Sequence, residues 1–377
     1  MRANTSLVGH YLFLYGGQGI YLPFLPLFLA AKGLDSVETG LLLAIGPGTS
    51  IIAQIVWGNF ADKHNRRKEY LALAVLGTAA VCFALSTARN IGGLALLLFI
   101  CAGFYSAVSP LTDALTLSAV ADTRRFGLFR RWGSLGFAVT AAGGGWFFSR
   151  LPIGMFGVVA GSLYALTVPW AVALPNPRFR TRPVPAAFPL AQVLRARGVK
   201  VLLVIVLLIM IPYGAYSSFL GWHLQSLGAS RLWVGIAWTI AALSEVPVFG
   251  LGNRWLKRVP VRMLMAVAAT VFAVRWLGYA NIRSYPIIVF FQLTQSVSFG
   301  LFYLAAVEDM TRLVPAGLRS SAQGLLQAVG FGVGAIVGSA GGGWLLEHSG
   351  MGVLYIAMAG LAGLGALGCW LWPEQKA

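Results

Sequence analysis

Long apolar runs alternate with short polar segments along almost the whole chain. Twelve runs can be marked, each long enough to supply the roughly 20 residues with which an α-helix crosses a bilayer. They cover residues 7–31, 38–60, 70–88, 91–120, 127–149, 152–174, 199–227, 232–252, 261–281, 285–311, 318–346 and 351–372. The pattern predicts an all-α polytopic membrane protein with twelve transmembrane helices. We expect the first run to be a retained helix, because no small-residue cleavage site accompanies it.

The composition agrees with this pattern. Of the 377 residues, 58% are hydrophobic and only 10% are charged, which excludes a water-soluble surface of that size. The three cysteines, Cys82, Cys101 and Cys369, all fall in apolar runs, where we expect small hydrophobic side chains and no disulfide or metal site. The four histidines do not have metal-ligand spacing, and no nucleophile has a neighbouring base. The sequence therefore predicts neither an enzyme nor a cofactor.

The cations are distributed unevenly between the two sides of the predicted membrane. The formal net charge is +17. With the N-terminus inside, 22 of the 28 Lys and Arg residues fall at the inner face and five at the outer face, while Arg275 alone lies within a span. This positive-inside pattern sets topology, so we expect the lipid bilayer, and no nucleic acid, as the partner of the basic residues. The predicted location is a bacterial cytoplasmic (inner) membrane, with both termini cytoplasmic.

Two passages of the first half recur in the second half. Residues 136–146 match residues 334–344 at an offset of 198, and Gly33 and Gly40, with three apolar residues before them, recur as Gly228 and Gly235 at an offset of 195. Such an internal repeat predicts two six-helix bundles, 1–174 and 199–377, related by a pseudo-two-fold axis. The proline-rich segment 175–198 between them is predicted to be a cytoplasmic linker with a short surface helix at its end.

The loop after the second run combines a glycine, an acid and a cluster of cations, namely Gly58, Asp62, Lys63, Arg66 and Arg67. We expect the glycine to permit close helix approach, the acid to accept hydrogen bonds from backbone N–H groups or pair with a cation, and the cations to hold the loop at the anionic inner leaflet. The alternative is a solvated basic loop that only orients the protein. The matching loop of the second half has Arg254 in place of the acid, which predicts two non-equivalent gates.

This loop resembles the signature between helices 2 and 3 of the major facilitator superfamily, with Asn65 where glycine is usual. The chain resembles that superfamily over its whole length. The resemblance implies the two-bundle fold and transport by alternating access.

Four passages resemble the superfamily branch that holds the lactose permease and the phenylpropionate permease type of proton symporter. They are the start of the fifth run at 126–136, residues 110–113, residues 242–247 and residues 274–278. This resemblance implies that Asp113 and Arg130 orient the substrate. It implies that Glu245 and Arg275 belong to the coupling network.

The tenth run departs from that branch. Where those relatives place a histidine in helix 10, this chain has Gln295, which takes up no proton. Tyr303, one or two turns away, is a weak candidate for the same role.

Ionisable groups within spans cost free energy and are functional candidates in their own right. Asp113 and Arg130 lie at similar depth, about 8–10 Å from a shared turn, so they can pair; the alternative role is a clamp between helices that never touches substrate. Glu245 and Arg275 differ in depth by about 12 Å, too far for contact without helix tilt or an intervening substrate. Glu245 is the preferred proton carrier and Asp113 the next, and Arg275 favours an anionic substrate or else neutralises Glu245 permanently.

Further polar residues lie on helices that can line a cavity. Each of them is equally able to join helices to one another; they are Gln18, Gln54, Tyr213, Tyr216, Trp238 and Gln292, beside Gln295 and Tyr303. Glu308 and Asp309 are expected to meet Arg312 or Arg319.

Together these residues predict a proton-coupled symporter that imports a small organic solute, an organic or aromatic acid, as a monomer with the proton as coupling ion. The alternative is a proton-antiport exporter of small molecules or drugs, which is disfavoured because the fifth run lacks a proline after Gly136. A membrane sensor or scaffold without transport would not need matched repeats around charges inside the membrane.

Overall fold

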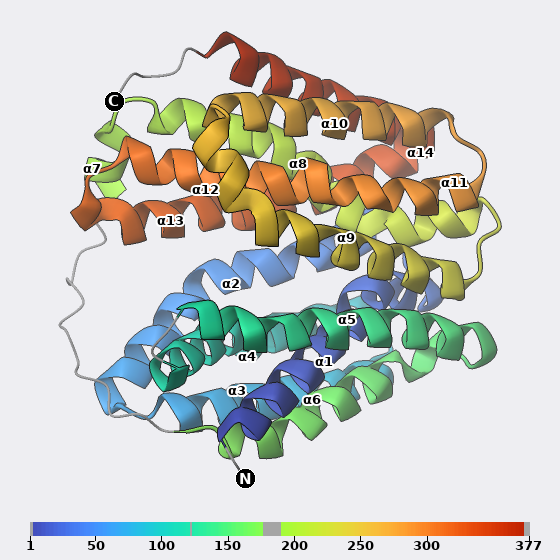
Figure 1. Cartoon of the computed structure of the whole chain (residues 1–377). Helices are drawn as coiled ribbons and strands as arrows, with labels where there is room; N and C mark the ends of the chain where they lie inside the picture. The colour runs from blue at the N-terminus through green and yellow to red at the C-terminus, as the bar shows by residue number, and fades with distance from the viewer. Residues whose placement is uncertain (1–2, 121–122, 176–189, 373–377) are drawn as a thin grey trace. The chain divides into compact units, whose positions relative to one another are not determined.

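The computed structural model describes residues 3–120, 123–175 and 190–372, which are almost entirely helical and contain no strand (Figure 1). The first half of the chain holds α1 (Ala3–Ala31), α2 (Ser36–His64), α3 (Arg67–Thr87), α4 (Ile91–Val120), α5 (Thr123–Arg150), the short 3-10 helix η1 (Ile153–Met155) and α6 (Phe156–Val172). This agrees with six predicted helices in that half.

The second half begins with α7 (Leu190–Arg195), a short helix where the sequence predicts one. It continues through α8 (Val199–Ser226), α9 (Arg231–Arg258), α10 (Val261–Asn281), α11 (Tyr285–Phe290), η2 (Phe291–Thr294), η3 (Ser296–Leu301), α12 (Phe302–Leu313), η4 (Ala316–Leu318), α13 (Arg319–Gln327), η5 (Ala328–Gly334) and α14 (Ala335–Leu371). Most of the predicted linker, residues 176–189, lies outside the described residues.

Two compact units make up the chain. Unit 1 contains Met1–Leu34, Leu42–Pro183 and Ala229–Thr239, and unit 2 contains Asp35–Leu41, Val184–Gly228 and Ile240–Ala377. They follow the two halves of the sequence, except that the first turns of α2 group with unit 2 and those of α9 with unit 1. The predicted boundaries at 174 and 199 stay a prediction.

Nine helical segments of the described ranges are long and apolar enough to cross a membrane. The last of them, Ala316–Leu371, has 56 residues, which is enough for two crossings. Gly350 breaks it with φ 80° and ψ 172°, a backbone conformation that glycine adopts without strain. α5 and α9 are 28 residues long each and carry several charges, which lower their hydropathy. The count of twelve crossings therefore stays a prediction.

The interior of each unit forms around one long helix. In unit 1, α1 packs against α5 and α6, and its Tyr11, Phe24 and Phe28 are fully buried. In unit 2, α14 packs against α8 and α10, and Phe219 and Trp276 are fully buried. Because these aromatic side chains face inward, the functional polar groups beside them are held by rigid neighbours.

The internal repeat reappears as a repeated contact. A Cβ atom on Gly40 would lie 2.3 Å from the carbonyl oxygen of Ser339 and 3.2 Å from the Cα of Gly343, within unit 2. A Cβ atom on Gly235 would lie 2.1 Å from the carbonyl oxygen of Ala141 and 3.2 Å from the Cα of Gly145, within unit 1. The residues of the two contacts are related by the offsets of 195 and 198 found in the sequence. These glycines let two helix backbones touch.

The span that begins at Tyr285 is irregular. It passes from the α-helix α11 through the 3-10 helix η2 and the π-helix η3 before α12 resumes α-helical geometry. A second π-helix, η5, joins α13 to α14. Local departures of this kind often mark functional sites, because they redirect side chains that a regular helix would spread over its whole face.

The predicted role of Gly58 is wrong in this structure. A Cβ atom there would have no neighbour within 4 Å, so the glycine does not serve close helix approach. The loop itself is very short, since α2 ends at His64 and α3 begins at Arg67, with Asn65 at φ 51°. Lys63 and Arg66 are exposed there, as expected of cations at a membrane surface.

Candidate functional site

Unit 1 carries a polar cluster between α1, α4 and α5. The Tyr11 hydroxyl on α1 donates to Asp113 Oδ1 on α4 at 3.1 Å and lies 3.3 Å from Thr116 Oγ1. One position earlier, His10 Nε2 on α1 lies 2.9 Å from Thr112 Oγ1 on α4. Tyr11 and Tyr15 are four residues apart on one helix face, and their rings stack 5.9 Å apart with an interplanar angle of 4°.

Arg130 reaches this cluster from α5 through an aromatic ring. Its guanidinium lies over the Tyr15 ring, with Cζ 4.1 Å from the ring centroid. Gly133, one turn further along α5, gives the ring its space, because a Cβ there would lie 2.6 Å from Tyr15 Cδ2. Arg130 is close enough to Asp113 to interact with it electrostatically.

The direct pairing expected between Asp113 and Arg130 is wrong. No ion pair joins them in the described structure; the carboxylate accepts from the Tyr11 hydroxyl, and the guanidinium lies over the ring of Tyr15, which stacks on Tyr11. A cation over a tyrosine face gains about 0.5–2 kcal/mol, so Tyr15 replaces the carboxylate as the immediate partner of Arg130. The two charges still interact electrostatically.

Unit 2 holds Arg275 in a closed set of neutral partners. Its Nε donates to the Tyr279 hydroxyl at 3.1 Å, its Nη2 to Gln292 Oε1 at 2.7 Å, and its Nη1 to Gln295 Oε1 and, at 3.4 Å, to Ser298 Oγ. The side chain also lies near aromatic faces, with Cζ 4.7 Å from the Tyr216 ring centroid, 5.0 Å from that of Trp276 and 5.4 Å from that of Tyr279. Arg275 is 1% exposed. We call Arg275 and these neighbours the Arg275 cage, which comprises Tyr216, Arg275, Trp276, Tyr279, Gln292, Gln295 and Ser298.

Gln292 is the centre of the Arg275 cage. Its amide oxygen accepts hydrogen bonds from Arg275 and, at 2.6 Å, from the Tyr216 hydroxyl, and its amide nitrogen donates to the Tyr279 hydroxyl at 2.8 Å. The side chain is fully buried. The 3-10 turn of η2 and the π-helix η3 place Gln292, Gln295 and Ser298 on the same side, facing α10. A buried cation is thereby solvated by amide and hydroxyl dipoles in place of water.

Glu245 lies on α9, half-buried, and is not among the polar partners of Arg275. It packs against η3, since a Cβ on Gly300 would come 3.8 Å from Glu245 Cγ. It interacts electrostatically with Tyr213 and Tyr216. Tyr213 and Tyr216 are thus electrostatic neighbours of both Glu245 and Arg275, and the expected difference in depth between the two charges stays a prediction.

The remaining predicted cavity residues are dispersed. Gln18 on α1 is 9% exposed and Gln54 on α2 is exposed, and neither makes a side-chain hydrogen bond within the described ranges. Trp238 on α9 lies near Phe137 in unit 1, with ring centroids 6.4 Å apart. Gln295 donates to the Tyr213 hydroxyl at 3.4 Å, and Gln327 donates to the Tyr303 hydroxyl. The structure thus joins Gln295 to Tyr213 but leaves Gln18 and Gln54 without a shared site.

The predicted gate residues show only part of their expected roles. Lys63, Arg66 and Arg254 are exposed and Arg67 is half-buried. The side chain of Asp62 lies outside the described residues, so its expected hydrogen bonds stay a prediction.

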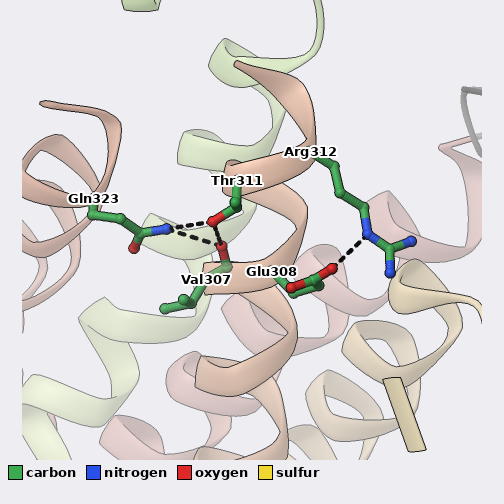
Figure 2. Close-up of polar contacts among 5 residues, drawn as sticks. All are labelled: Val307, Glu308, Thr311, Arg312 and Gln323. Carbon is green, nitrogen blue, oxygen red and sulfur yellow. Dashed lines mark hydrogen bonds and ion pairs between the residues drawn. The ribbon is translucent and has the colours of Figure 1, made fainter. Parts of the chain in front are cut away.

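Glu308 and Asp309 have different partners. Glu308 Oε1 accepts from Arg312 Nε at 2.8 Å within α12, as expected (Figure 2). Asp309 pairs instead with Arg262 of α10, Oδ2 to Nε 3.7 Å, and not with Arg312 or Arg319, because it faces inward where α10 packs. Arg262 also lies over the Trp372 ring at 3.6 Å.

Comparison with known proteins identifies the class of this molecule. The model of the MFS_1 like family matches residues 4–357. The chain belongs to the MFS_1 like family. It is therefore a multi-pass membrane transporter of the major facilitator superfamily and not an enzyme, as the sequence motifs predicted.

Individual members of this superfamily match over nearly their whole length. The maltose permease of Geobacillus stearothermophilus is 31% identical over 354 residues, 92% of this chain and 88% of the relative. The probable 3-phenylpropionic acid transporter of Escherichia coli K12 is 25% identical over 374 residues, 94% of each. The crystal structure of the nucleoside transporter NupG aligns with a TM-score of 0.88 at 16% identity, covering 99% of this transporter and 100% of that chain. At that identity the structural likeness shows the fold alone.

Tyr11, Tyr15 and Tyr279 were not predicted as neighbours of the charges. Tyr11 and Tyr15 are spaced four apart, as are Arg275 and Tyr279, and this spacing was a usable signal. Gln292 was predicted only as a residue that could line a cavity; its hydrogen bonds had no sequence signal, because its partners Tyr216 and Arg275 are 76 and 17 residues away in the chain.

Proposed function

We propose that this transporter is a proton-coupled symporter that imports a small organic acid across a bacterial cytoplasmic membrane. The observation that carries the proposal is the Arg275 cage, a fully buried cation whose polar partners are neutral. Amide and hydroxyl dipoles solvate such a cation only in part, so an anion that arrives nearby gains Coulombic stabilisation in a medium of low dielectric constant. A substrate carboxylate would supply this anion.

We propose that Glu245 carries the coupled proton. This carboxylate stands beside Tyr213, which is hydrogen-bonded through Gln295 to the Arg275 cage. A second anion there would be repelled unless Glu245 carries a proton, because two carboxylates in one desolvated site do not both ionise readily. Asp113, held by Tyr11 in unit 1, is the second candidate for proton transfer. Binding of proton and acid together then favours reorientation of the two six-helix bundles.

Neutral sugars are the second candidate substrates. The maltose permease relative at 31% identity favours them, and so do the hydrogen bonds that Arg275 already makes to Tyr279, Gln292 and Gln295. In that case Arg275 holds the Arg275 cage together and has no part in binding.

Uptake into proteoliposomes tests the proposal. Vesicles of purified protein, acidic outside, are given radiolabelled 3-phenylpropionate or maltose, with and without a protonophore. The proposal predicts that the acid accumulates above its external concentration and that the protonophore abolishes the accumulation. A correction for the passive entry of the protonated acid comes from protein-free vesicles. Accumulation of maltose alone would favour the second candidate, and uptake unaffected by the protonophore would contradict proton coupling.

A further inference from the structure

Unit 2 contains a continuous series of aromatic rings beside the Arg275 cage. The rings of Tyr213 on α8 and Phe299 on η3 stack 4.6 Å apart with an interplanar angle of 13°. Phe299 and Tyr303, four residues apart, continue the stack at 6.0 Å and 8°. Phe331 on η5 stands across it, at 75° to Tyr303 and 81° to Phe299, with centroids 5.8 and 6.0 Å away. We call these four residues the aromatic ladder.

The four rings of the aromatic ladder form a corner. Three of its rings are nearly parallel, and the fourth is nearly perpendicular to two of them. Tyr213, Phe299 and Tyr303 are half-buried, and Phe331 is 36% exposed. A flat ring placed in such a corner makes an offset stack and an edge contact at once, the two geometries that aromatic pairs prefer.

The polar groups of the aromatic ladder argue against a lipid-facing surface. The Tyr303 hydroxyl accepts a hydrogen bond from Gln327, the Tyr213 hydroxyl accepts one from Gln295, and Glu245 interacts electrostatically with Tyr213. Two amides, two hydroxyls and a carboxylate along one face within membrane spans would be costly against hydrocarbon. They are consistent with a face that water or a solute reaches.

The irregular helices position the ladder. The π-helix η3 carries Phe299 and the π-helix η5 carries Phe331. Gln323 of α13 donates to the Val307 carbonyl oxygen and to Thr311 Oγ1 of α12, both at 2.9 Å (Figure 2), and Gln327 repeats this cross-link one turn away at Tyr303. These hydrogen bonds from the glutamine side chains fix α13 on α12, and so hold Phe331 against Tyr303.

One hydrogen-bond donor, the Tyr213 hydroxyl, remains for a ligand at the Tyr213 end of the stack. The Tyr213 hydroxyl accepts from Gln295, and within the described residues its own proton is given to no acceptor. Behind Gln295 stands the guanidinium of Arg275. A carboxylate at this end would accept from Tyr213 and lie in the positive field of Arg275, and an aryl group attached to it would extend over Phe299 and Tyr303.

We propose that the aromatic ladder is the subsite for the ring of an aryl carboxylic acid, with Phe299 as its main stacking surface and Tyr213 as the hydrogen-bond donor to the carboxylate. The proposal rests on the proposed function and narrows its substrate class from small organic acids to acids with a planar ring. Each aromatic contact contributes roughly two- to tenfold in affinity, so the two contacts in the corner predict about tenfold or more.

Equilibrium binding to the purified full-length protein in detergent tests the subsite. Titration calorimetry compares benzoate, 3-phenylpropionate and indole-3-acetate with hexanoate, which has a carboxylate and no ring. We expect at least one aryl acid to bind about tenfold or more tightly than hexanoate. Equal affinities throughout, or no binding of any aryl acid, would overturn the proposal.

Substitutions assign the preference to the ladder. Phe299→Leu should reduce the aryl acid to within about twofold of hexanoate, while Phe299→Tyr retains the preference. Tyr213→Phe should weaken both acids about equally, because it removes only the carboxylate donor. Phe290→Leu is the matched control, since Phe290 lies on the same span, 66% exposed, and outside the ladder. An aryl preference that persists in Phe299→Leu refutes the assignment; if that variant does not fold, Phe331→Leu and Tyr303→Leu decide in the same way.

The outcomes separate the two proposals. Aryl-selective binding without proton-driven accumulation would retain the subsite and reject the symport. Proton-driven accumulation of hexanoate and of aryl acids that bind with equal affinity would retain the symport and reject the subsite.

Discussion

At the scale of single residues, the charges inside this transporter have aromatic, hydroxyl and amide groups as their immediate partners. Asp113 accepts from Tyr11, Arg130 lies over Tyr15, and Arg275 donates to the neutral groups of the Arg275 cage. Direct pairing would neutralise each charge permanently. Polarizable partners stabilise a charge while leaving it able to respond to a proton or a substrate.

Tyr15 is expected to act through its ring and not through its hydroxyl. Tyr15→Phe retains the stack on Tyr11 and the face beneath Arg130, so transport should stay within about twofold of wild type. Tyr15→Leu loses both contacts, each worth about 0.5–2 kcal/mol, and should reduce the initial uptake rate about tenfold. Initial rates in proteoliposomes at matched protein density check this. Equal rates for the two variants would contradict the role of the ring.

Gln292 is expected to be essential for the stability of unit 2. Gln292→Leu removes one buried hydrogen-bond partner from each of Arg275, Tyr216 and Tyr279, which should cost about 2–3 kcal/mol. Thermal unfolding in detergent should show a midpoint lower by several degrees. Thr294→Val is the control, because in the described part of the chain the Thr294 hydroxyl bonds only to the Phe291 carbonyl of its own helical turn. A midpoint unchanged by Gln292→Leu would mean that the hydrogen bonds of the cage contribute little to folding.

At the scale of helices, glycines set which backbones touch. Gly40 and Gly235 occupy equivalent places in the repeat, and each meets a carbonyl oxygen of a facing helix at a distance that admits no side chain. The Ser36 N–H and hydroxyl beside the first contact bond to Glu347 Oε2 on α14, at 3.2 and 2.5 Å. In the other unit, the Leu232 N–H bonds to Ser149 Oγ at 2.9 Å. The first turns of α2 and α9 are thus anchored in the same manner.

A single methyl group at either glycine should disturb this anchoring. Gly40→Ala places a Cβ 2.3 Å from backbone oxygen, so the first turns of α2 must move away from α14, and the unfolding midpoint should fall. Gly46→Ala, in the same helix with no neighbour within 4 Å of its Cβ, should leave the midpoint unchanged or raise it slightly, because alanine is the better helix former. Equal unfolding midpoints for the two variants would contradict the close contact between Gly40 and α14.

The helices could be predicted from the sequence, but the contacts between side chains of different helices could not. The runs of apolar residues predicted the helices, because a helix must be apolar over a certain length to span a membrane. The repeat at offsets 195 and 198 predicted the matching of the two halves, because the glycines that allow backbone contact recur in it. Gly58 shows the limit: a glycine in a familiar motif does not reveal whether a neighbouring helix approaches it. The partner of Asp309 was missed for a related reason, since Arg262 is distant in the chain and meets it only through helix packing.

At the scale of the whole molecule, the family and the fold are those of the major facilitator superfamily, and the coupling residues remain a proposal. Unit 2 holds the Arg275 cage, Glu245 and the aromatic ladder within a few turns of one irregular span. Unit 1 holds Asp113 and Arg130 around two tyrosines. We therefore expect the solute to bind in unit 2, with Asp113 as the second candidate for proton transfer.

The most direct test of the coupling uses Glu245→Gln in proteoliposomes with 3-phenylpropionate. The account predicts that the variant loses accumulation driven by an imposed pH gradient but still exchanges internal for external labelled acid in counterflow, because the amide keeps the shape of the site without carrying a proton. Glu308→Gln is the control, since Glu308 is ion-paired with Arg312 on the exposed end of α12 and should leave both activities intact. Uphill accumulation by Glu245→Gln would contradict the account and move the coupling acid elsewhere, with Asp113 next to be tested.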